Sequence, residues 1–484
     1  MNQINSHSTS IFFIMFKYKR YIFICLFLFF LKVYSATYSP NWDSLNSRPN
    51  PSWYDSSKFG IFIHWGVYAV PAFGNLSSAE WYWFAINHPW FDNGTAMDYH
   101  YRAYGQNYHY QDFANDFKAE MFDPNLWANI IESSGAKYVV FTSKHHEGFT
   151  MWPSAQSWGW NSVDLGPQMD LVGILTKAIK AKGIHMGLYH SLFEWYNPLY
   201  LADNSTVPPQ TNTYVQEILL PQLKDIVLSY EPDVVWADGE WEQNDTYWES
   251  TEFIAWLYND SPVKDSVVVN DRWGLGCRNT NGGFWTGGDK WNPGHLVDHK
   301  WENCNTIGRS WGYDEWEPFI WYQTSTYLIQ QMIITVSCGG NYLLDVGPTA
   351  SGIIPPLMVE RLTDIGNWLS INGEAIYESV PWRCQNDSST PDIWYTYNNE
   401  SMSIYAFVFN WPTDNKVTLS DPIPGDKSQV LLMGVNNINH QNTPTSMNIS
   451  FKSISSGGLQ VTLPSLTPTQ FPPFVYTLKL VNFK

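Results

Sequence analysis

Basic residues are scarce in this chain of 484 residues. Lys and Arg together number 27 against 45 Asp and Glu, which gives a formal net charge of −18 at pH 7. Residues 1–35 hold four of the basic residues and no acidic ones, so the rest of the chain carries −22. Phosphate backbones and anionic lipid surfaces attract basic proteins and repel acidic ones. Nucleic acid and anionic membranes are therefore excluded as partners.

Long hydrophobic runs are also rare. The run that stands out is "YIFICLFLFFL", residues 21–31, and its 11 residues fall short of the roughly 20 that a membrane-spanning helix needs. It follows Lys17, Lys19 and Arg20 and precedes the small-residue sequence "VYSA", a pattern typical of a secretory signal peptide cleaved after Ser35. We therefore assign residues 1–35 to a signal peptide rather than an anchor, and expect a secretory-pathway protein without a membrane segment after cleavage.

Cysteines are few, and their pairing stays open. Cys25 lies in the signal peptide, which leaves Cys277, Cys304, Cys338 and Cys384. In an oxidising compartment these four allow one or two disulfides, or they are buried thiols.

Export is also indicated by eight Asn-X-Ser/Thr sequons, of which that at Asn259 is weakened by the proline after its Ser261. The predicted glycosylation sites are Asn75, Asn93, Asn204, Asn244, Asn259, Asn386, Asn399 and Asn448.

Aromatic residues, by contrast, are abundant. They make up 17% of the chain, with 26 Trp. A tryptophan face packs against a protein core or against the C–H surface of a sugar, because both are apolar. The count therefore raises the expectation of a carbohydrate ligand without establishing one.

Between residues 56 and 377, short apolar runs alternate with segments of helical periodicity. The clearest helix is predicted for 170–182, where Asp170 caps an apolar face and Gly183 ends it. Further helices are predicted for 214–230, 252–258, 327–336 and 357–369. The predicted buried strands contain "GIFIHWG", "KYVVFTS", "IHMGLYHS", "PDVVWADG", "DSVVVNDRW" and "NYLLDVGP". This alternation predicts a (β/α)8-like (TIM-type) barrel for residues 36–378.

After residue 379 the apolar residues alternate with period two. "SIYAFVF", "KVTL", "QVLLMG", "LQVTL" and "VYTLKL" are separated by Pro, Gly, Asn and Asp. This pattern predicts a C-terminal antiparallel β-sandwich over residues 379–484.

Polar residues follow most of the predicted barrel strands. In such barrels the carboxyl ends of the strands form the active-site face. Five strands end in acids, histidines, arginine or aromatics, which is more than structure alone requires. The residues concerned are His64 and Trp65, His145, His146 and Glu147, Tyr189 and His190, Trp236 and Asp238, and Asp271, Arg272 and Trp273.

Three short motifs carry the acids and histidines that matter most. In "VVWADGEW", Asp238 either caps a turn or is a functional carboxylate shielded by its flanking tryptophans. In "KHHEGF", zinc binding is not expected, because adjacent histidines on a strand point to opposite faces and no HExxH helix is present. In "PGHLVDHKWENC", Glu302 is an ordinary loop acid unless glycoside chemistry needs a second carboxylate, for which Glu240 and Glu80 are also candidates.

The chain resembles the α-L-fucosidases of glycoside hydrolase family 29. Pro293, Leu296, Lys300, Trp301, Glu302 and Cys304 match the family pattern P-x-x-L-x-x-x-K-W-E-x-C, and "KFGIFIHWG", "AEWY", "KHHEGF", "WADGEW", "NDRW" and "GGNYLLDVGP" resemble further family motifs in order. The resemblance implies that Asp238 is the catalytic nucleophile and Glu302 the general acid/base. It implies that fucose is bound by His64, Glu80, Trp81, His145, His146, Tyr189, Trp236 and Arg272.

The expected reaction is retaining hydrolysis of terminal α-L-fucosyl residues through a covalent glycosyl-aspartate. Two carboxylates about 5 to 5.5 Å apart suffice for this chemistry, so no metal or other cofactor is expected. The implied substrates are fucosylated oligosaccharides, glycoproteins or glycolipids, and similarity to animal members implies the lysosome as an alternative to secretion. A sugar-binding protein without turnover and a metal-dependent hydrolase are the competing interpretations, and a homo-oligomer stays open.

Overall fold

The structure is a computed structural model that describes residues 37–75, 78–436, 444–455 and 457–484. The predicted signal peptide, residues 1–35, lies outside the described residues. Within those ranges the structure contains no helix that is both long and apolar enough to cross a bilayer.

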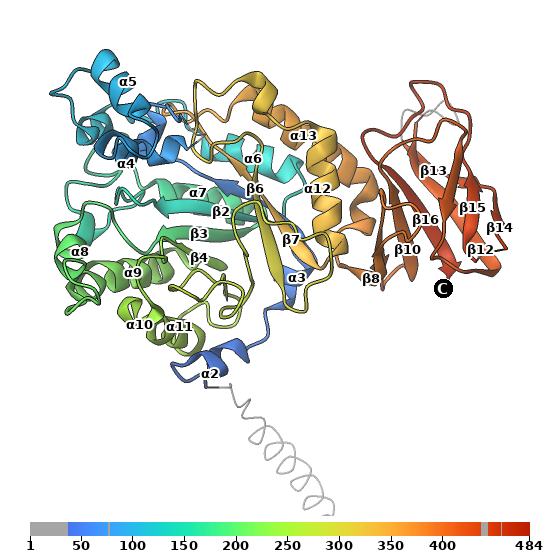
Figure 1. Cartoon of the computed structure of the whole chain (residues 1–484), viewed down its shortest axis with the longest axis horizontal. Helices are drawn as coiled ribbons and strands as arrows, with labels where there is room; N and C mark the ends of the chain where they lie inside the picture. The colour runs from blue at the N-terminus through green and yellow to red at the C-terminus, as the bar shows by residue number, and fades with distance from the viewer. Residues whose placement is uncertain (1–36, 76–77, 437–443, 456) are drawn as a thin grey trace, which may run out of the picture. The chain divides into compact units, whose positions relative to one another are not determined.

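The first domain is built on a curled sheet of seven parallel strands (Figure 1). The strands are β1 (Phe59–Ile63), β2 (Tyr138–Lys144), β3 (His185–Ser191), β4 (Val234–Asp238), β5 (Val268–Val269), β6 (Trp301–Thr306) and β7 (Gly340–Val346). Their order in the sheet is β5-β4-β3-β2-β1-β7-β6. The predicted barrel-like fold is confirmed, with seven regular strands in place of eight.

The two edge strands, β5 and β6, are joined by the irregular segment 283–286. Two amide groups of this segment donate to the carbonyl of Val269 in β5 (3.1 Å each). On the other side the backbone amide of Trp285 donates to the carbonyl of Lys300 (2.9 Å). The carbonyl of Trp285 accepts from the amide of Glu302 in β6 (2.8 Å). Backbone hydrogen bonds therefore complete the ring through a segment that occupies the place of the eighth strand.

Aromatic side chains fill the barrel interior. Successive strands and segment 283–286, which closes the ring, contribute to one buried cluster. It includes Phe62, Tyr138, Tyr189, Trp236 and Phe284. Eight tryptophans are less than 2% exposed, so much of the aromatic content is core.

The helices confirm the predicted periodicity. The Asp170 side chain accepts from the amide of Gly173 (2.8 Å) and begins α7 (Leu171–Ala181). The predicted helix 214–230 starts with a π-helical turn, η5 (Val215–Leu219), and continues as α9 (Leu220–Tyr230). Pro221 lacks the amide hydrogen that a regular helix needs there, which accounts for the wider turn. The other predicted helices are α11 (Ser250–Asn259), α12 (Ser325–Ser337) and α13 (Pro356–Asn372).

The remaining helical segments were not predicted from the periodicity. They are α2 (Trp42–Asn46), α3 (Ser52–Ser57), η1 (Val67–Ala69), η2 (Ala79–Trp81), α4 (Tyr82–Asn87), α5 (Thr95–Ala103), η3 (Tyr110–Asn115), α6 (Pro124–Ser133), η4 (Ala155–Ser157), α8 (Pro198–Asp203), α10 (Asp245–Trp248), η6 (Phe319–Trp321) and η7 (Gly373–Ala375).

The C-terminal strands form two antiparallel sheets around one core. The larger has the order β13-β12-β16-β10-β9-β8 and the smaller β11-β15-β14. Ile404, Val417, Leu432, Val461 and Leu478 from both sheets share a buried cluster, which confirms the predicted antiparallel domain. The strands are β8 (Ser379–Asn386), β9 (Ile393–Asn398), β10 (Ser403–Val408), β11 (Lys416–Leu419), β12 (Pro424–Val435), β13 (Thr445–Ile449), β14 (Phe451–Ser453), β15 (Leu459–Thr462) and β16 (Tyr476–Phe483).

Cys277, Cys304, Cys338 and Cys384 are free thiols in the structure, which decides between the two alternatives left open by their spacing. Among the sequons, Asn75, Asn93, Asn244, Asn399 and Asn448 are exposed, and the other three asparagines are half-buried. Glycosylation at the eight sites stays a prediction.

Candidate active site

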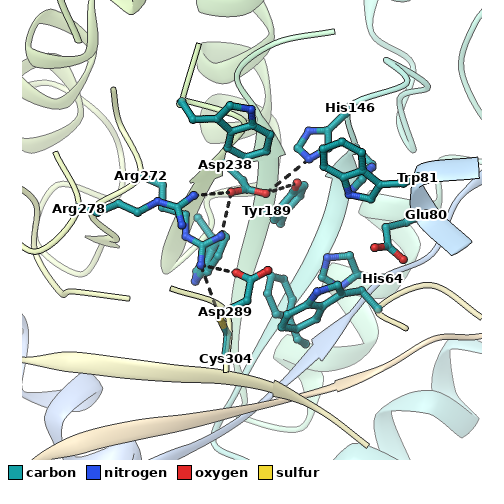
Figure 2. A pocket seen from close by; sticks show the side chains of 15 residues that line it. His64, Glu80, Trp81, His146, Tyr189, Asp238, Arg272, Arg278, Asp289 and Cys304 are labelled. Carbon is teal, nitrogen blue, oxygen red and sulfur yellow. Dashed lines mark hydrogen bonds and ion pairs between the residues drawn. The ribbon is translucent and has the colours of Figure 1, made fainter. Parts of the chain in front are cut away.

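One cavity of about 320 Å³ opens at the carboxyl ends of the barrel strands (Figure 2). The structure brings nine of the ten predicted site residues to this cavity: His64, Glu80, Trp81, His145, His146, Tyr189, Trp236, Asp238 and Arg272. Several follow a strand directly or end it, as His64 follows β1 and Asp238 ends β4. Because the strands are parallel, their carboxyl ends meet and these side chains converge.

Asp238 lies among donors on both sides (Figure 2). Its Oδ1 accepts from Nη1 of Arg272 (3.0 Å) and faces Nη2 of Arg278 (3.8 Å), while its Oδ2 accepts from the Tyr189 hydroxyl (2.9 Å). Burial alone would raise the pKa of Asp238, but the two guanidinium groups and the Tyr189 hydrogen bond outweigh it and hold that pKa below its ordinary value. The carboxylate is therefore ionised, as a nucleophile must be.

His146 faces the other side of Asp238, with Nε2 3.7 Å from Oδ2. The Ser191 hydroxyl donates its proton to the carbonyl of Phe193 (2.7 Å), so Nδ1 of His146 donates to Ser191 Oγ (2.6 Å). Burial, and then the nearby His145, lower the pKa of His146 well below its ordinary value. The ring is therefore neutral and presents an unprotonated Nε2 to the cavity, where it can accept from a sugar hydroxyl.

A buried acid, Asp345, holds the imidazole ring of His64. Its Nδ1 lies 2.7 Å from Oδ1 of Asp345 in β7, and both residues are buried. Burial, followed by the effect of His145, lowers the pKa of His64 to about 3, so this imidazole is also neutral. The contact between Nδ1 and Asp345 fixes the orientation of the ring and leaves Nε2 as the ring nitrogen that can contact a ligand.

The orientation expected for the adjacent histidines is wrong. Strand β2 ends at Lys144, so His145 and His146 lie beyond the pleated backbone, and both line the cavity with ring centroids 4.0 Å apart. Strand alternation therefore gives no argument against a metal here. Over the ranges that the structure describes, no group of three or more His, Cys, Asp or Glu side chains has the arrangement of a metal site.

Glu302 is the predicted site residue that the structure does not bring to the cavity. It is the second residue of β6 and is completely buried in the barrel interior. Its carboxylate accepts from Tyr54 (2.8 Å), Tyr138 (2.6 Å) and the Trp236 indole (2.9 Å). A general acid has to reach the leaving oxygen, directly or through one water. The acid/base role of Glu302 stays a prediction that this position does not support, because its oxygens face three protein donors and Glu302 does not line the cavity.

The two alternative acids also differ in position. Glu240 is 2% exposed and does not line the cavity, and its Oε1 accepts from Nε of Arg278 (2.5 Å). Glu80 does line it, but its Oε2 accepts from the amide of Gly312 (3.0 Å) and the hydroxyl of Ser310 (3.3 Å). Glu240 thus orients Arg278, whereas Glu80 can bind substrate hydroxyl groups.

Six further residues line the cavity that sequence reasoning did not identify: Phe62, Trp241, Arg278, Asp289, Cys304 and Trp311. Asp289 is the most consequential, because it adds a carboxylate. Its Oδ1 accepts from Nη2 of Arg272 (2.7 Å), so one guanidinium joins Asp238 and Asp289 (Figure 2). The Asp289 side chain is 51% exposed. The sequence "FWTGGD", an apolar run before Gly-Gly-Asp, resembles the other strand ends and could have drawn attention to it.

Cys304 does not compete as a nucleophile. Its Sγ lies 3.8 Å from Nη2 of Arg272. Burial raises the pKa of the Cys304 thiol to about 12, against the opposing effect of Arg272. The thiol is therefore protonated, whereas thiol nucleophiles react as thiolates.

Comparison with known proteins agrees with this geometry. Residues 29–374 match the family model for α-L-fucosidase, and residues 385–481 match that for the α-L-fucosidase C-terminal domain. The chain is 55% identical over 461 residues to an α-L-fucosidase of Dictyostelium discoideum, covering 95% of this chain and 98% of that one. It is 45% identical over 453 residues to tissue α-L-fucosidase of Homo sapiens, covering 92% of each.

Among solved structures, the Thermotoga maritima α-fucosidase in complex with fucose is similar, with a TM-score of 0.76 and 33% identity over 92% of this chain and all of that one. The family models together span most of the chain, and the similar proteins cover 92% to 95% of it. The chain therefore belongs to the α-L-fucosidase family and is a glycoside hydrolase.

Proposed function

We propose that the protein removes terminal α-L-fucosyl residues with net retention, through a covalent bond between the sugar C1 and a carboxylate oxygen of Asp238. The single observation that carries the proposal is the environment of Asp238, an ionised carboxylate held by Arg272 and Tyr189 at the wall of the cavity. Fixed donors of this kind orient the nucleophile and cost no reorganisation during the reaction.

Asp289 is the proposed general acid/base. Among the three carboxylates lining the cavity, Glu80 is buried and held by two donors, whereas the Asp289 side chain is half-exposed at the mouth. A leaving group departs toward solvent, so the acid that protonates it must lie on that side. In the bound state Asp289 turns from Arg272 to the glycosidic oxygen, and afterwards it removes a proton from the attacking water.

The cavity suits a 6-deoxy sugar. The imidazoles of His64 and His146, the carboxylate of Glu80 and the guanidinium of Arg272 supply acceptors and donors for hydroxyl groups. Trp236 and its aromatic neighbours supply an apolar wall for the C5 methyl group and the C–H face. The Thermotoga relative was solved with fucose, which supports the same sugar here.

The substrates are proposed to be fucosylated oligosaccharides, glycoproteins or glycolipids. The predicted signal peptide and the similarity to a tissue α-L-fucosidase support a secretory-pathway protein that is lysosomal or secreted. A homo-oligomer is compatible with this function and is tested by the mass in solution.

The stereochemical course tests the mechanism. Proton NMR of the first-formed product from an aryl α-L-fucoside should show α-L-fucose before it mutarotates. First-formed β-L-fucose would mean inversion, which needs carboxylates roughly 6.5 to 9.5 Å apart, and would overturn the covalent mechanism.

A further inference from the structure

The loop between β6 and α12, residues 307–324, belongs both to the cavity and to the surface. Trp311 lines the cavity, and the amide of Gly312 donates to Glu80 (3.0 Å). A few residues further on, Trp316, Phe319 and Ile320 are 63%, 74% and 84% exposed. Together with Trp321 they form what we call the apolar patch.

Such exposure within one short loop calls for an explanation. Single exposed apolar side chains are common, but contiguous ones mark a binding surface. Two tryptophans of the patch pack against neighbouring side chains. Trp316 contacts the rings of Phe73 and Tyr99 edge-on, and the Arg309 guanidinium lies 4.0 Å from the Trp321 ring centre. These contacts hold the two tryptophans in place, whereas Phe319 and Ile320 are largely exposed to solvent.

A relay of contacts links the apolar patch to the Asp289 side of the cavity. Lys290, the residue after Asp289, donates through Nζ to the carbonyl of Arg309 (3.0 Å), and Arg309 in turn covers Trp321. Lys290 and Arg309 thus link the segment that follows Asp289 to Trp321 of the apolar patch.

We propose that the apolar patch binds the leaving glycan by stacking neutral pyranose rings beyond the sugar directly joined to fucose. Resting on the proposed function, this inference specifies an oligosaccharide substrate and not merely a terminal fucose. Aromatic and aliphatic side chains fit the C–H face of a pyranose, which shields them from water. The net charge of −22 for residues 36–484 disfavours an anionic membrane as the occupant, and a second copy of the chain is an outcome of the test.

The test compares substrates of two lengths on the double variant Phe319→Ala/Ile320→Ala. 4-Nitrophenyl α-L-fucoside is too short to reach the patch, whereas lacto-N-fucopentaose I carries four further neutral sugars. The variant should raise KM for the pentasaccharide about five- to tenfold, as expected for lost ring contacts, and leave the aryl fucoside unchanged. Trp158→Ala, which removes an 88% exposed tryptophan from the loop between β2 and α7, is the matched control and should change neither.

Binding of the fucose-free product provides a readout that does not depend on catalysis. Saturation-transfer NMR with lacto-N-tetraose should detect contact with the wild type and Trp158→Ala, and none with the double variant. Equal losses on both substrates, no loss on either, or a wild-type oligomer that the double variant dissociates would each overturn the inference. Failure of the wild type to cleave the aryl fucoside would instead refute the proposed function.

Discussion

Two buried carboxylates in the same barrel, Asp238 and Glu302, have opposite surroundings. Asp238 is the last residue of β4, and Glu302 is the second residue of β6. Asp238 faces two guanidinium groups and a cavity, whereas Glu302 faces two phenol hydroxyls and an indole N–H and no cavity. Position along the barrel axis separates the acid that lines the cavity from the acid in the barrel interior.

The neighbours of each carboxylate explain its ionisation. Burial raises the pKa of Glu302, and the hydrogen bonds from Tyr138, Trp236 and Tyr54 offset this only in part. At Asp238 the positive charges reverse the effect of burial. Nearby guanidinium groups therefore explain why the pKa of Asp238 is lowered while that of Glu302 is raised.

Trp236 links the two sites. Its indole N–H donates to Glu302, while its ring lines the cavity and lies 4.6 Å from the guanidinium carbon of Arg272. Glu302 thus holds the orientation of one wall of the cavity. This gives Glu302 a role that does not require proton transfer.

Removing the proposed nucleophile should give the largest effect. Asp238→Ala is expected to lower kcat/KM by roughly 10⁴-fold or more on every substrate, because in the proposed mechanism its carboxylate forms the bond to C1. Fucose binding and the melting temperature should change far less. Near-normal turnover would show that Asp238 is not the nucleophile.

Removing the proposed acid should give an effect that depends on the leaving group. Asp289→Ala is expected to lower kcat/KM about 10²- to 10⁴-fold for fucosyl oligosaccharides and much less for an activated aryl fucoside, because only the poor leaving group needs a proton. Added azide should restore turnover of the aryl fucoside as fucosyl azide.

Asp298→Ala is the matched control, since Asp298 is an exposed acid in the same loop that does not line the cavity. It should retain full activity on both substrates. If azide rescues a Glu80 variant and not Asp289→Ala, Glu80 is the acid/base.

Glu302→Gln should test whether Glu302 stabilises the fold and orients Trp236 without transferring a proton. The amide replaces one acceptor among three donors, so unfolding should become easier by about 1–3 kcal/mol. Through Trp236, kcat/KM should fall less than about tenfold, by the same factor for good and poor leaving groups. A leaving-group-dependent loss with azide rescue would restore Glu302 as the acid/base.

Arg278→Gln should give the smallest effect, visible in the pH profile. Loss of the charge 3.8 Å from Asp238 raises the pKa of that carboxylate, so the acidic limb of kcat/KM moves to higher pH, by about one unit or less. Arg278→Lys keeps the charge and should leave the limb near its wild-type position. An unchanged limb in Arg278→Gln would mean that Arg278 does not help to ionise Asp238.

The fold was largely predictable because most barrel strands are apolar runs followed by turns. The exception is β6, whose sequence "WENCNT" contains four polar residues, all buried. Their partners, such as Thr335 for Asn303 and Tyr138 for Glu302, lie far away in the sequence. The closing segment 283–286 was missed because it makes barrel hydrogen bonds without regular strand length.

The candidate site was predictable where a residue ends or follows a regular strand, as Asp238 and His64 do. A family motif drew attention to Glu302, but a motif does not reveal at which end of a strand a side chain lies. Asp289 lies in a long loop without periodicity, and its place beside Arg272 arises only from tertiary folding. Depth along the barrel and the course of loops were the information that local sequence lacked.

Trapping the intermediate tests the central claim most directly. A 2-deoxy-2-fluoro-fucosyl donor with a good leaving group should inactivate the protein, and peptide mapping by mass spectrometry should locate one fluorofucosyl group on Asp238. An adduct on Asp289, Glu302 or another side chain, or turnover with no adduct at all, would contradict the account.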